Sequence, residues 1–364
     1  MELKEKEQII ENVGDYIEFV RYWTSMPLVQ MIEKQISYIR ELSEAFVSGS
    51  DFAWKKDFLD NDEDAYSRLS HRCIHYLNEA LIEAKRELSL CESKSGSTDY
   101  FCYYRGQYDS RWDVMPSVFR PQYIEDESYL YHEIMVRCPD EFESLSHLDR
   151  LVKMQHYSCP TRLLDVTANP LVALYFACKN YGCQKCDAAD VGKIILFRAN
   201  KKQVAYADSD KVLMLSCLPR FDKSSQWELL QQVDASEKDG RFKQKQGGSS
   251  YKEPIVEQLY HEISREVPSF KREIVPMDLL KPIFVQPNRM NNRILKQDGA
   301  FIISGLCNLP GEISLRIMAM SNTSILVVNK EEILRELDSI GINEASLFPE
   351  VDKVAEYLKN KRKL

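Results

Sequence analysis

Apolar side chains recur every three or four residues through the first part of the chain. Residues 17–23 and 31–39 follow this spacing, and between Asp64 and Leu90 it is carried by Leu69, Cys73, Leu77, Leu81, Ala84 and Leu88. Such spacing gathers apolar side chains into one stripe along an α-helix. The pattern predicts a helical N-terminal section over residues 1–97, which ends in the polar, glycine-containing stretch 92–98.

Beyond this stretch the pattern changes to short apolar runs. Residues 192–198, 281–285, 299–303 and 324–328 are short and rich in β-branched and aromatic residues, which predicts strands. Residues 171–179 are apolar nearly all round and follow Asn169-Pro170, a pair suited to a helix start, so a buried helix is expected there. Helices and strands do not alternate regularly. The fold class predicted is α+β, with a mixed domain over residues 98–364 built on a central, largely antiparallel sheet.

Composition narrows the possible partners. The 364 residues include 48 Lys and Arg against 56 Asp and Glu, a net charge of −8, which disfavours a nucleic-acid binder. The start of the chain lacks an apolar signal region, and no apolar run approaches the ~20 residues of a membrane helix. A cytoplasmic protein without membrane contact is therefore expected. The ten cysteines are scattered, which is typical of reduced thiols. The polar stretch at about 234–254 predicts a mobile loop.

Two polar runs next to apolar sequence are the candidate chemistry. Phe101–Gln107 places Arg105 between aromatic residues and a glycine, and Gln155–Asn169 is dense in polar side chains. Polar groups so close to a core should converge on a ligand or on each other. Arg105 could grip two oxygens of a phosphate or carboxylate, with Gly106 letting the ligand approach the backbone. An ion pair with Asp109 or Asp165 is an equally good reading.

The second run offers a carboxylate and a hydroxyl. On a strand Asp165 and Thr167 would share one face while Arg162 points away. This pair suits a ribose or a proton transfer, and equally the cap of the helix that follows. Gln155 and His156 would add a neutral donor and a titrating base.

Two further features lie outside these runs. Gln297 precedes an expected strand, so its amide should lie at the mouth of that strand. Cys183 and Cys186 form a single Cys-x-x-Cys pair, which is a weak zinc signal without a second pair. No metal site is predicted.

The motifs together resemble the FRG domain, named for a Phe-Arg-Gly motif. The resemblance is carried by Tyr104-Arg-Gly-Gln, Met115-Pro-Ser, the Gln155 to Ala177 run, Gln297-x-Gly-Ala-Phe and Ser346-Leu-Phe-Pro-Glu-Val-Asp. Tyr104 stands in place of the motif's Phe, and Val166 stands where a Trp is common. The resemblance extends from about Asp99 to the C-terminus and implies a single FRG domain there.

The order of these features is also similar to the Arg, Ser/Thr and Glu arrangement of ADP-ribosyltransferases. That similarity implies that Arg105 holds the phosphates of NAD, as a possible substrate, and that Thr167 supports the nicotinamide ribose. Gln297 occupies the place of the glutamate, and an amide cannot serve as a carboxylate base. The ligand-binding set implied by both resemblance and chemistry comprises Tyr104, Arg105, Gln107, Gln155, His156, Arg162, Asp165 and Asn169, and the catalytic set comprises Arg105, Thr167 and Gln297.

Three hypotheses for the function follow. The first is binding of a nucleotide or NAD-like ligand with ADP-ribosyltransferase-like or NAD-hydrolysing chemistry, which FRG proteins would associate with bacterial defence. The second is a non-catalytic ligand-sensing or interaction module, whose N-terminal helices contact a protein partner. The third is a toxin acting on nucleic acid through Lys and Arg at 241–245 and the aromatic residues around 101–108.

Overall fold

The computed structural model describes residues 8–48, 63–93, 99–180, 191–236, 240–243, 251–288 and 292–361. Cys183 and Cys186, the end of the stretch 92–98 and much of the expected loop at 234–254 lie outside the described residues. The N-terminal helices are α1 (Val13–Ser25), α2 (Leu28–Ser48) and α4 (Glu63–Ser93), which confirms the helical prediction. A two-residue strand, β1 (Ile9–Ile10), precedes them and was not expected.

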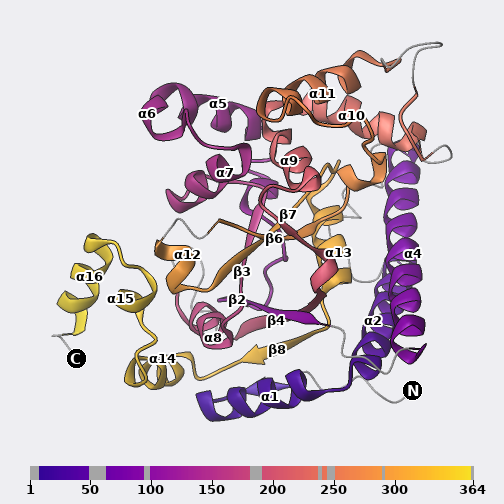
Figure 1. The fold of residues 1–364 in the computed structure, drawn as a ribbon. Coiled ribbons are helices and arrows are strands. Elements are labelled where there is room, and N and C mark those ends of the chain that lie inside the picture. The colour runs from indigo at the N-terminus through magenta and orange to yellow at the C-terminus, as the bar shows by residue number, and fades with distance from the viewer. Residues whose placement is uncertain are drawn as a thin grey trace.

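An eight-stranded sheet forms the centre of the molecule (Figure 1). Its order is β1-β8-β4-β2-β3-β7-β6-β5, and only the β1–β8 and β5–β6 pairs at the two edges are parallel. The strands are β2 (Tyr100–Gln107), β3 (Leu163–Thr167), β4 (Gly192–Asn200), β5 (Val204–Tyr206), β6 (Ile283–Gln286), β7 (Gly299–Ile303) and β8 (Thr323–Val327). The α+β class with a largely antiparallel sheet is confirmed.

Helices surround this sheet. They are α5 (Glu127–Arg137), α6 (Pro139–Phe142), α7 (His147–His156), α8 (Pro170–Cys178), α9 (Asp210–Ser216), α10 (Lys223–Ser236), α11 (Pro254–Glu266), α12 (Asn292–Lys296), α13 (Pro310–Met320), α14 (Lys330–Ser339), α15 (Glu344–Leu347) and α16 (Val351–Lys361), with short 3₁₀ turns η1 (Ser117–Phe119) and η3 (Leu218–Arg220) among them. Among the described residues, no helix is long and apolar enough to cross a membrane.

Two clusters of buried side chains share one face of the sheet. The first joins α1, α8 and α14 to β2, β4 and β8. The second joins α7, α9 and α11 to β3, β6 and β7. The opposite face is covered by residues 114–119 and by α13. This division follows the alternation of side chains along each strand, since Tyr104 packs on the first face and Tyr103 on the other.

Helix α8 lies directly on β2 at Gly106. A Cβ atom at this position would lie 1.9 Å from the main-chain oxygen of Ala173 and 2.7 Å from the nitrogen of Ala177. The expectation that Gly106 lets a ligand approach the backbone is therefore corrected, because the group that approaches is this helix. The helix is capped by Asn169 and buried along most of its length, as predicted.

The N-terminal helices pack onto the rest of the chain. The apolar stripes of α2 and α4 face each other and contact Leu315 and Ala319 of α13. Arg72 of α4 adds a buried ion pair to Glu312 of α13. The apolar stripes predicted from the sequence therefore pack against other parts of the same chain.

Candidate functional site

The two central strands that carry the sequence motifs are paired over a very short stretch. β2 pairs with β4 along its whole length, from Tyr100 to Gln107. With β3 it forms one registered pair, between Tyr104 and Thr167. Opposed residues of antiparallel strands share a face, so the side chain of Arg105 lies on the face of Val166. Asp165 and Thr167 face the other way, together with Tyr104.

The hydrogen-bond partner of the Arg105 guanidinium is an uncharged main-chain oxygen. Its Nη1 donates to the main-chain oxygen of Asp165 at 2.7 Å, in place of the donor that a longer β2–β3 ladder would supply. Asp109 pairs instead with Arg111. Among the described residues no carboxylate lies within ion-pair distance of Arg105, so neither ion pair expected from the sequence forms.

The charge of Arg105 is therefore only partly balanced. Its Nε is buried and makes no hydrogen bond within the described part of the chain. Burial lowers the pKa of the guanidinium, the Asp165 carboxylate raises it, and the guanidinium of Arg120 lowers it. A second positive charge thus acts on the same place. Arg120 follows η1, and η1 is anchored beside β3 by the hydrogen bond from Val118 N–H to the oxygen of Thr161 at 3.3 Å.

Gln107 lies on the same face of β2, two residues beyond Arg105. It is 4 % exposed, and its Nε2 donates to the main-chain oxygen of Asp113 at 3.3 Å. The oxygen of the same amide, Oε1, therefore points away from Asp113, and it is buried without a hydrogen-bond partner among the described residues. A donor at Arg105 Nε and an acceptor at Gln107 Oε1 are therefore both unsatisfied. Buried groups of this kind are rare and costly in folded proteins.

The other predicted catalytic groups form a separate network. Thr167 Oγ1 donates to the main-chain oxygen of Gln297 at 2.6 Å and accepts from Asn169 N–H at 2.9 Å. Gln297 Nε2 donates to the oxygen of Leu347 at 3.1 Å. Asn169 Oδ1 accepts from Leu171 N–H and caps α8. These bonds tie the end of β3 to α8, β7 and α15, and they engage the hydroxyl and the amide that were expected to meet a ligand.

Three more of the sequence candidates are used in packing. Arg162 is fully buried and pairs with Glu127. It also donates to the main-chain oxygen of Ser304 at 3.1 Å. Gln155 Oε1 accepts from Thr161 Oγ1. Tyr104 is buried against Trp23, with the two ring centroids 5.9 Å apart.

His156 and Asp165 are more accessible. His156 Nε2 lies 3.5 Å from Glu350 Oε1. Asp165 is exposed although β3 is a central strand, because its position lies between the two clusters that cover this face. No described residue donates a hydrogen bond to its carboxylate. Of the sequence candidates, the structure thus brings Arg105, Gln107 and the backbone of Asp165 together.

Among the described residues, no group of three or more His, Cys, Asp or Glu side chains is arranged to hold a metal ion. Arg120, by contrast, contributes to the electrostatics of Arg105 and carried no role in the sequence interpretation. Arg120 follows the Met115-Pro-Ser motif closely in sequence, but its proximity to Arg105 depends on how residues 113–120 fold back over β2 and β3.

Comparison with known proteins identifies one region. Residues 101–185 match the family model of the FRG domain. This segment runs from β2 through α8 and contains Arg105, Gln107, Arg120 and Asp165. Neither a curated protein nor a solved structure matches the chain.

Proposed function

Because the chain carries an FRG domain over residues 101–185, we propose that this domain binds an anionic, nucleotide-like ligand at Arg105. The observation that supports the proposal is the pair of unsatisfied atoms, Arg105 Nε and Gln107 Oε1, beside a guanidinium that forms no ion pair with a described carboxylate. A ligand with an oxyanion next to an O–H or N–H group would satisfy both atoms. Phosphates beside ribose hydroxyls or a base amine have this arrangement.

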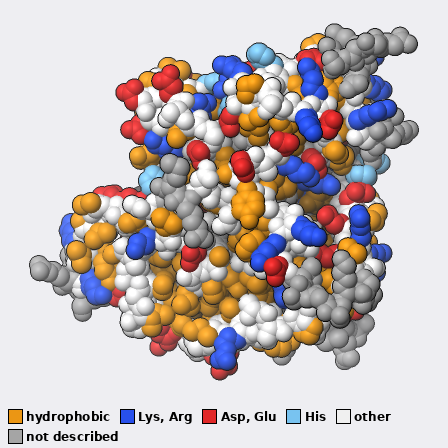
Figure 2. Space-filling view, viewed as in Figure 1, with side chains coloured by type: hydrophobic (Ala, Val, Ile, Leu, Met, Phe, Trp, Pro, Cys, Tyr) orange, Lys and Arg blue, Asp and Glu red, His pale blue; other side chains and the backbone are white. Residues whose placement is uncertain are grey.

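Charge supports a small ligand over a nucleic acid. The net charge of the chain is −8. On the face shown in Figure 2, Lys and Arg side chains alternate with Asp and Glu and form no continuous basic patch. A nucleic-acid backbone is followed by rows of positive charge. Arg105, with Arg120 as its positively charged neighbour, is suited to one or two phosphate groups.

The first test is ligand-dependent thermal stability. NAD, ADP-ribose, ADP and ATP would each be titrated into the full chain and into Arg105→Ala. At least one nucleotide is expected to raise the melting temperature of the wild type, since a ligand at 100 times its Kd adds about 2.7 kcal/mol. The shift should be smaller in Arg105→Ala, because this variant lacks the charge-assisted hydrogen bonds from the guanidinium to an oxyanion.

A matched variant separates this effect from a general loss of positive charge. Arg111 is 75 % exposed and pairs with Asp109 on the same segment, so Arg111→Ala should keep the ligand-induced shift. Circular dichroism of Arg105→Ala would verify its fold. A wild type that no nucleotide stabilises, or an equal shift in Arg105→Ala, would contradict the proposal.

The second candidate function is consumption of NAD at this site. The observation favouring it is the Asp165 carboxylate, which is exposed, receives no hydrogen bond from a described residue and lies close enough to raise the pKa of Arg105. Thr167 and Gln297 are engaged by backbone partners, which leaves Asp165 as the sequence candidate with a carboxylate able to polarise a ribose. The side chains of Arg105 and Asp165 lie on opposite faces of the sheet, so in this mechanism the ligand would pass the short β2–β3 pairing, with its phosphates at Arg105 and its ribose against the Asp165 carboxylate, which stabilises the developing positive charge.

Nicotinamide release on incubation with NAD tests this second function. The wild type is expected to release nicotinamide, and Asp165→Asn should lower the rate by roughly 10²-fold or more while the NAD-induced thermal shift remains. Asp99→Asn is the control, because Asp99 is a 70 % exposed carboxylate paired with Lys201. A wild type that binds NAD and leaves it intact would exclude the catalytic function and leave the ligand-sensing one.

A further inference from the structure

A pocket with no counterpart in the sequence motifs lies among the helices α7 and α11 and the turn η3. Its volume is about 440 Å³, and the side chains that matter for its chemistry are His147, Arg150, Arg220, Arg265 and Glu266. No residue of the Arg105 site lines it. A volume of this size falls within the ~300–1,000 Å³ of pockets that take small molecules.

His147 is the buried polar group of this pocket. It is 4 % exposed, and neither ring nitrogen makes a hydrogen bond within the described part of the chain. Its Nε2 lies 3.5 Å from Glu266 Oε2. Burial lowers the pKa of the imidazole to about 4, and Arg220 and Arg150 act in the same direction. The ring is therefore neutral at physiological pH, and the neighbours of its single N–H donor are Glu266 Oε2 at 3.5 Å and the backbone of Glu262, which raises the pKa.

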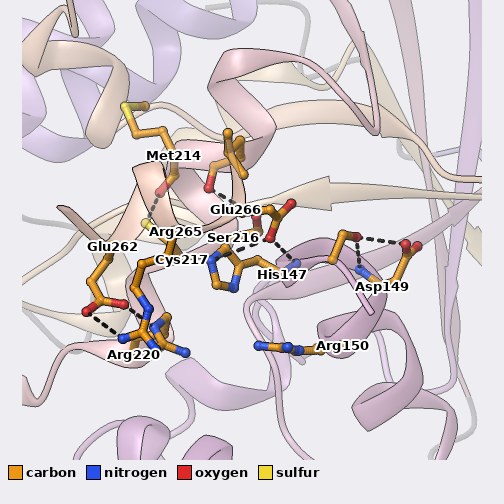
Figure 3. A network of polar contacts seen from close by, with 12 residues as sticks. His147, Asp149, Arg150, Met214, Ser216, Cys217, Arg220, Glu262, Arg265 and Glu266 are labelled. Carbon is orange, nitrogen blue, oxygen red and sulfur yellow. Dashed lines mark hydrogen bonds and ion pairs between the residues drawn. The ribbon is translucent and has the colours of Figure 1, made fainter. Parts of the chain in front are cut away.

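Arginines stand on both sides of this ring. Figure 3 shows His147 between the guanidinium groups of Arg220 and Arg150. Arg150 donates to the main-chain oxygens of Phe142 and Glu143, each at 3.1 Å, and to the Tyr131 hydroxyl at 3.4 Å. All three acceptors are neutral. The guanidinium of Arg150 is thus fixed in position while its charge has no carboxylate partner among the described residues.

The other two arginines share one acid. Arg220 Nε donates to Glu262 Oε2 at 2.6 Å, and Arg265 Nη1 donates to Glu262 Oε1 at 3.4 Å. Each of these guanidinium groups keeps N–H donors that face no carboxylate. The three arginines face Glu266 in the pocket lining and Glu262, which pairs with two of them outside the lining, and Asp149 acts on Glu266 from the first turn of α7. Glu143 also lines the pocket, but its side chain is exposed and its charge is screened by solvent.

The start of α7 already binds one carboxylate. The main-chain N–H of His147 donates to Glu266 Oε2 at 2.7 Å. Ser146 Oγ accepts from Asp149 N–H at 3.1 Å and caps the helix. Burial raises the pKa of the Glu266 carboxyl. The main-chain N–H of His147 and the charge of Arg150 lower it, and the charge of Asp149 raises it. These bonds occupy the helix terminus, so the groups left for a further anion are the remaining N–H donors of the arginines and the imidazole.

We infer that this pocket is a second binding site, for a phosphate-bearing small molecule whose phosphate lies between Arg150 and Arg220 against His147. A phosphate has enough oxygens to accept from the remaining N–H groups of two guanidinium groups and from an imidazole N–H at once. The volume beyond one phosphate accommodates the rest of a sugar- or nucleotide-sized molecule. The inference does not depend on ligand binding at Arg105.

The experiment uses the full chain with Arg105→Ala, so that the first site makes no contribution. Ribose 5-phosphate would be titrated calorimetrically, with ribose and succinate as comparison ligands. Ribose 5-phosphate is expected to bind, while ribose and succinate are not. Adding Arg150→Gln or Arg220→Gln should weaken binding roughly tenfold to a hundredfold, because each removes charge-assisted hydrogen bonds. Two arginine variants are used so that the test still applies if one of them fails to fold.

Arg137→Gln is the matched control. Arg137 is 73 % exposed and pairs with Glu133 on the neighbouring α5, so its loss should leave the affinity unchanged. A second readout is the NMR titration of His147, assigned with His147→Gln. Bound phosphate should raise the pKa of this imidazole from about 4, because the anion offsets Arg150 and Arg220.

Absence of binding to ribose 5-phosphate in the Arg105→Ala chain would overturn the inference. Unchanged affinity in both arginine variants would also overturn it, as would a His147 pKa that stays the same when ribose 5-phosphate is added. Succinate binding as tightly as ribose 5-phosphate would overturn the assignment to phosphate. A nucleotide-induced stabilisation that Arg105→Ala leaves intact would contradict the proposal for Arg105 without affecting this one.

Discussion

Replacing Gly106 by alanine is expected to prevent stable folding, with a loss of about 4 kcal/mol or more in the free energy of unfolding. The added Cβ would lie 1.9 Å from the oxygen of Ala173 and 2.7 Å from the nitrogen of Ala177. Both atoms belong to the backbone of α8, whose side chains are buried between β2 and its neighbours. The helix can yield only by moving as a whole, which would break that cluster. Urea denaturation followed by circular dichroism measures the loss.

Gly299→Ala is the matched control for this prediction. Gly299 begins β7, and a Cβ there would meet atoms of Ile294 at 3.6 Å, an ordinary contact. The variant is expected to change the free energy of unfolding by about 1 kcal/mol or less. If Gly106→Ala were as stable as Gly299→Ala and lost only ligand binding, the glycine of the motif would serve a ligand, and the close packing of α8 would be wrong.

Glu312→Gln is expected to reduce the free energy of unfolding by about 3–5 kcal/mol. Glu312 is 0 % exposed and accepts from two buried arginines, Arg316 at 2.7 Å and Arg72 at 3.4 Å. Burial lowers the pKa of Arg72, but Glu312 and Asp234 more than offset it. Removing the carboxylate charge leaves Arg316, which is 1 % exposed, without an ion-pair partner among the described residues. Chemical denaturation at neutral pH gives the magnitude.

The same substitution on an exposed pair provides the control. Glu331 is 91 % exposed and lies 3.6 Å from Arg335 on α14, so Glu331→Gln should cost at most about 0.5 kcal/mol. Because Arg72 belongs to α4 and Glu312 to α13, Glu312→Gln should also loosen the N-terminal helices, which faster amide exchange in α4 would reveal. Equal stability of the two variants would show that the buried cluster contributes no more than a surface pair.

Local structure was the part of the fold most accessible from sequence. The stripe between Asp64 and Leu90 and the apolar runs at 192–198 and 299–303 depend on periodicity, which is set by the geometry of one element. Asn169-Pro170 likewise identified the start of α8, because a cap is a contact between residues close in sequence. Strand β1 escaped this reasoning, since two residues are too few to show a period.

The sequence by itself determined the elements, the α+β class and the FRG motifs, because these depend on neighbouring residues. Only the tertiary structure decided which polar side chains are available. Arg105 and Arg162 each lie in one of the two polar runs, yet Arg162 pairs with Glu127 in the core while Arg105 donates to a carbonyl oxygen. The pocket at His147 is likewise assembled from α7, η3 and α11. A charge is neutralised by whatever packs against it in space, and the partners of these residues are far away along the chain.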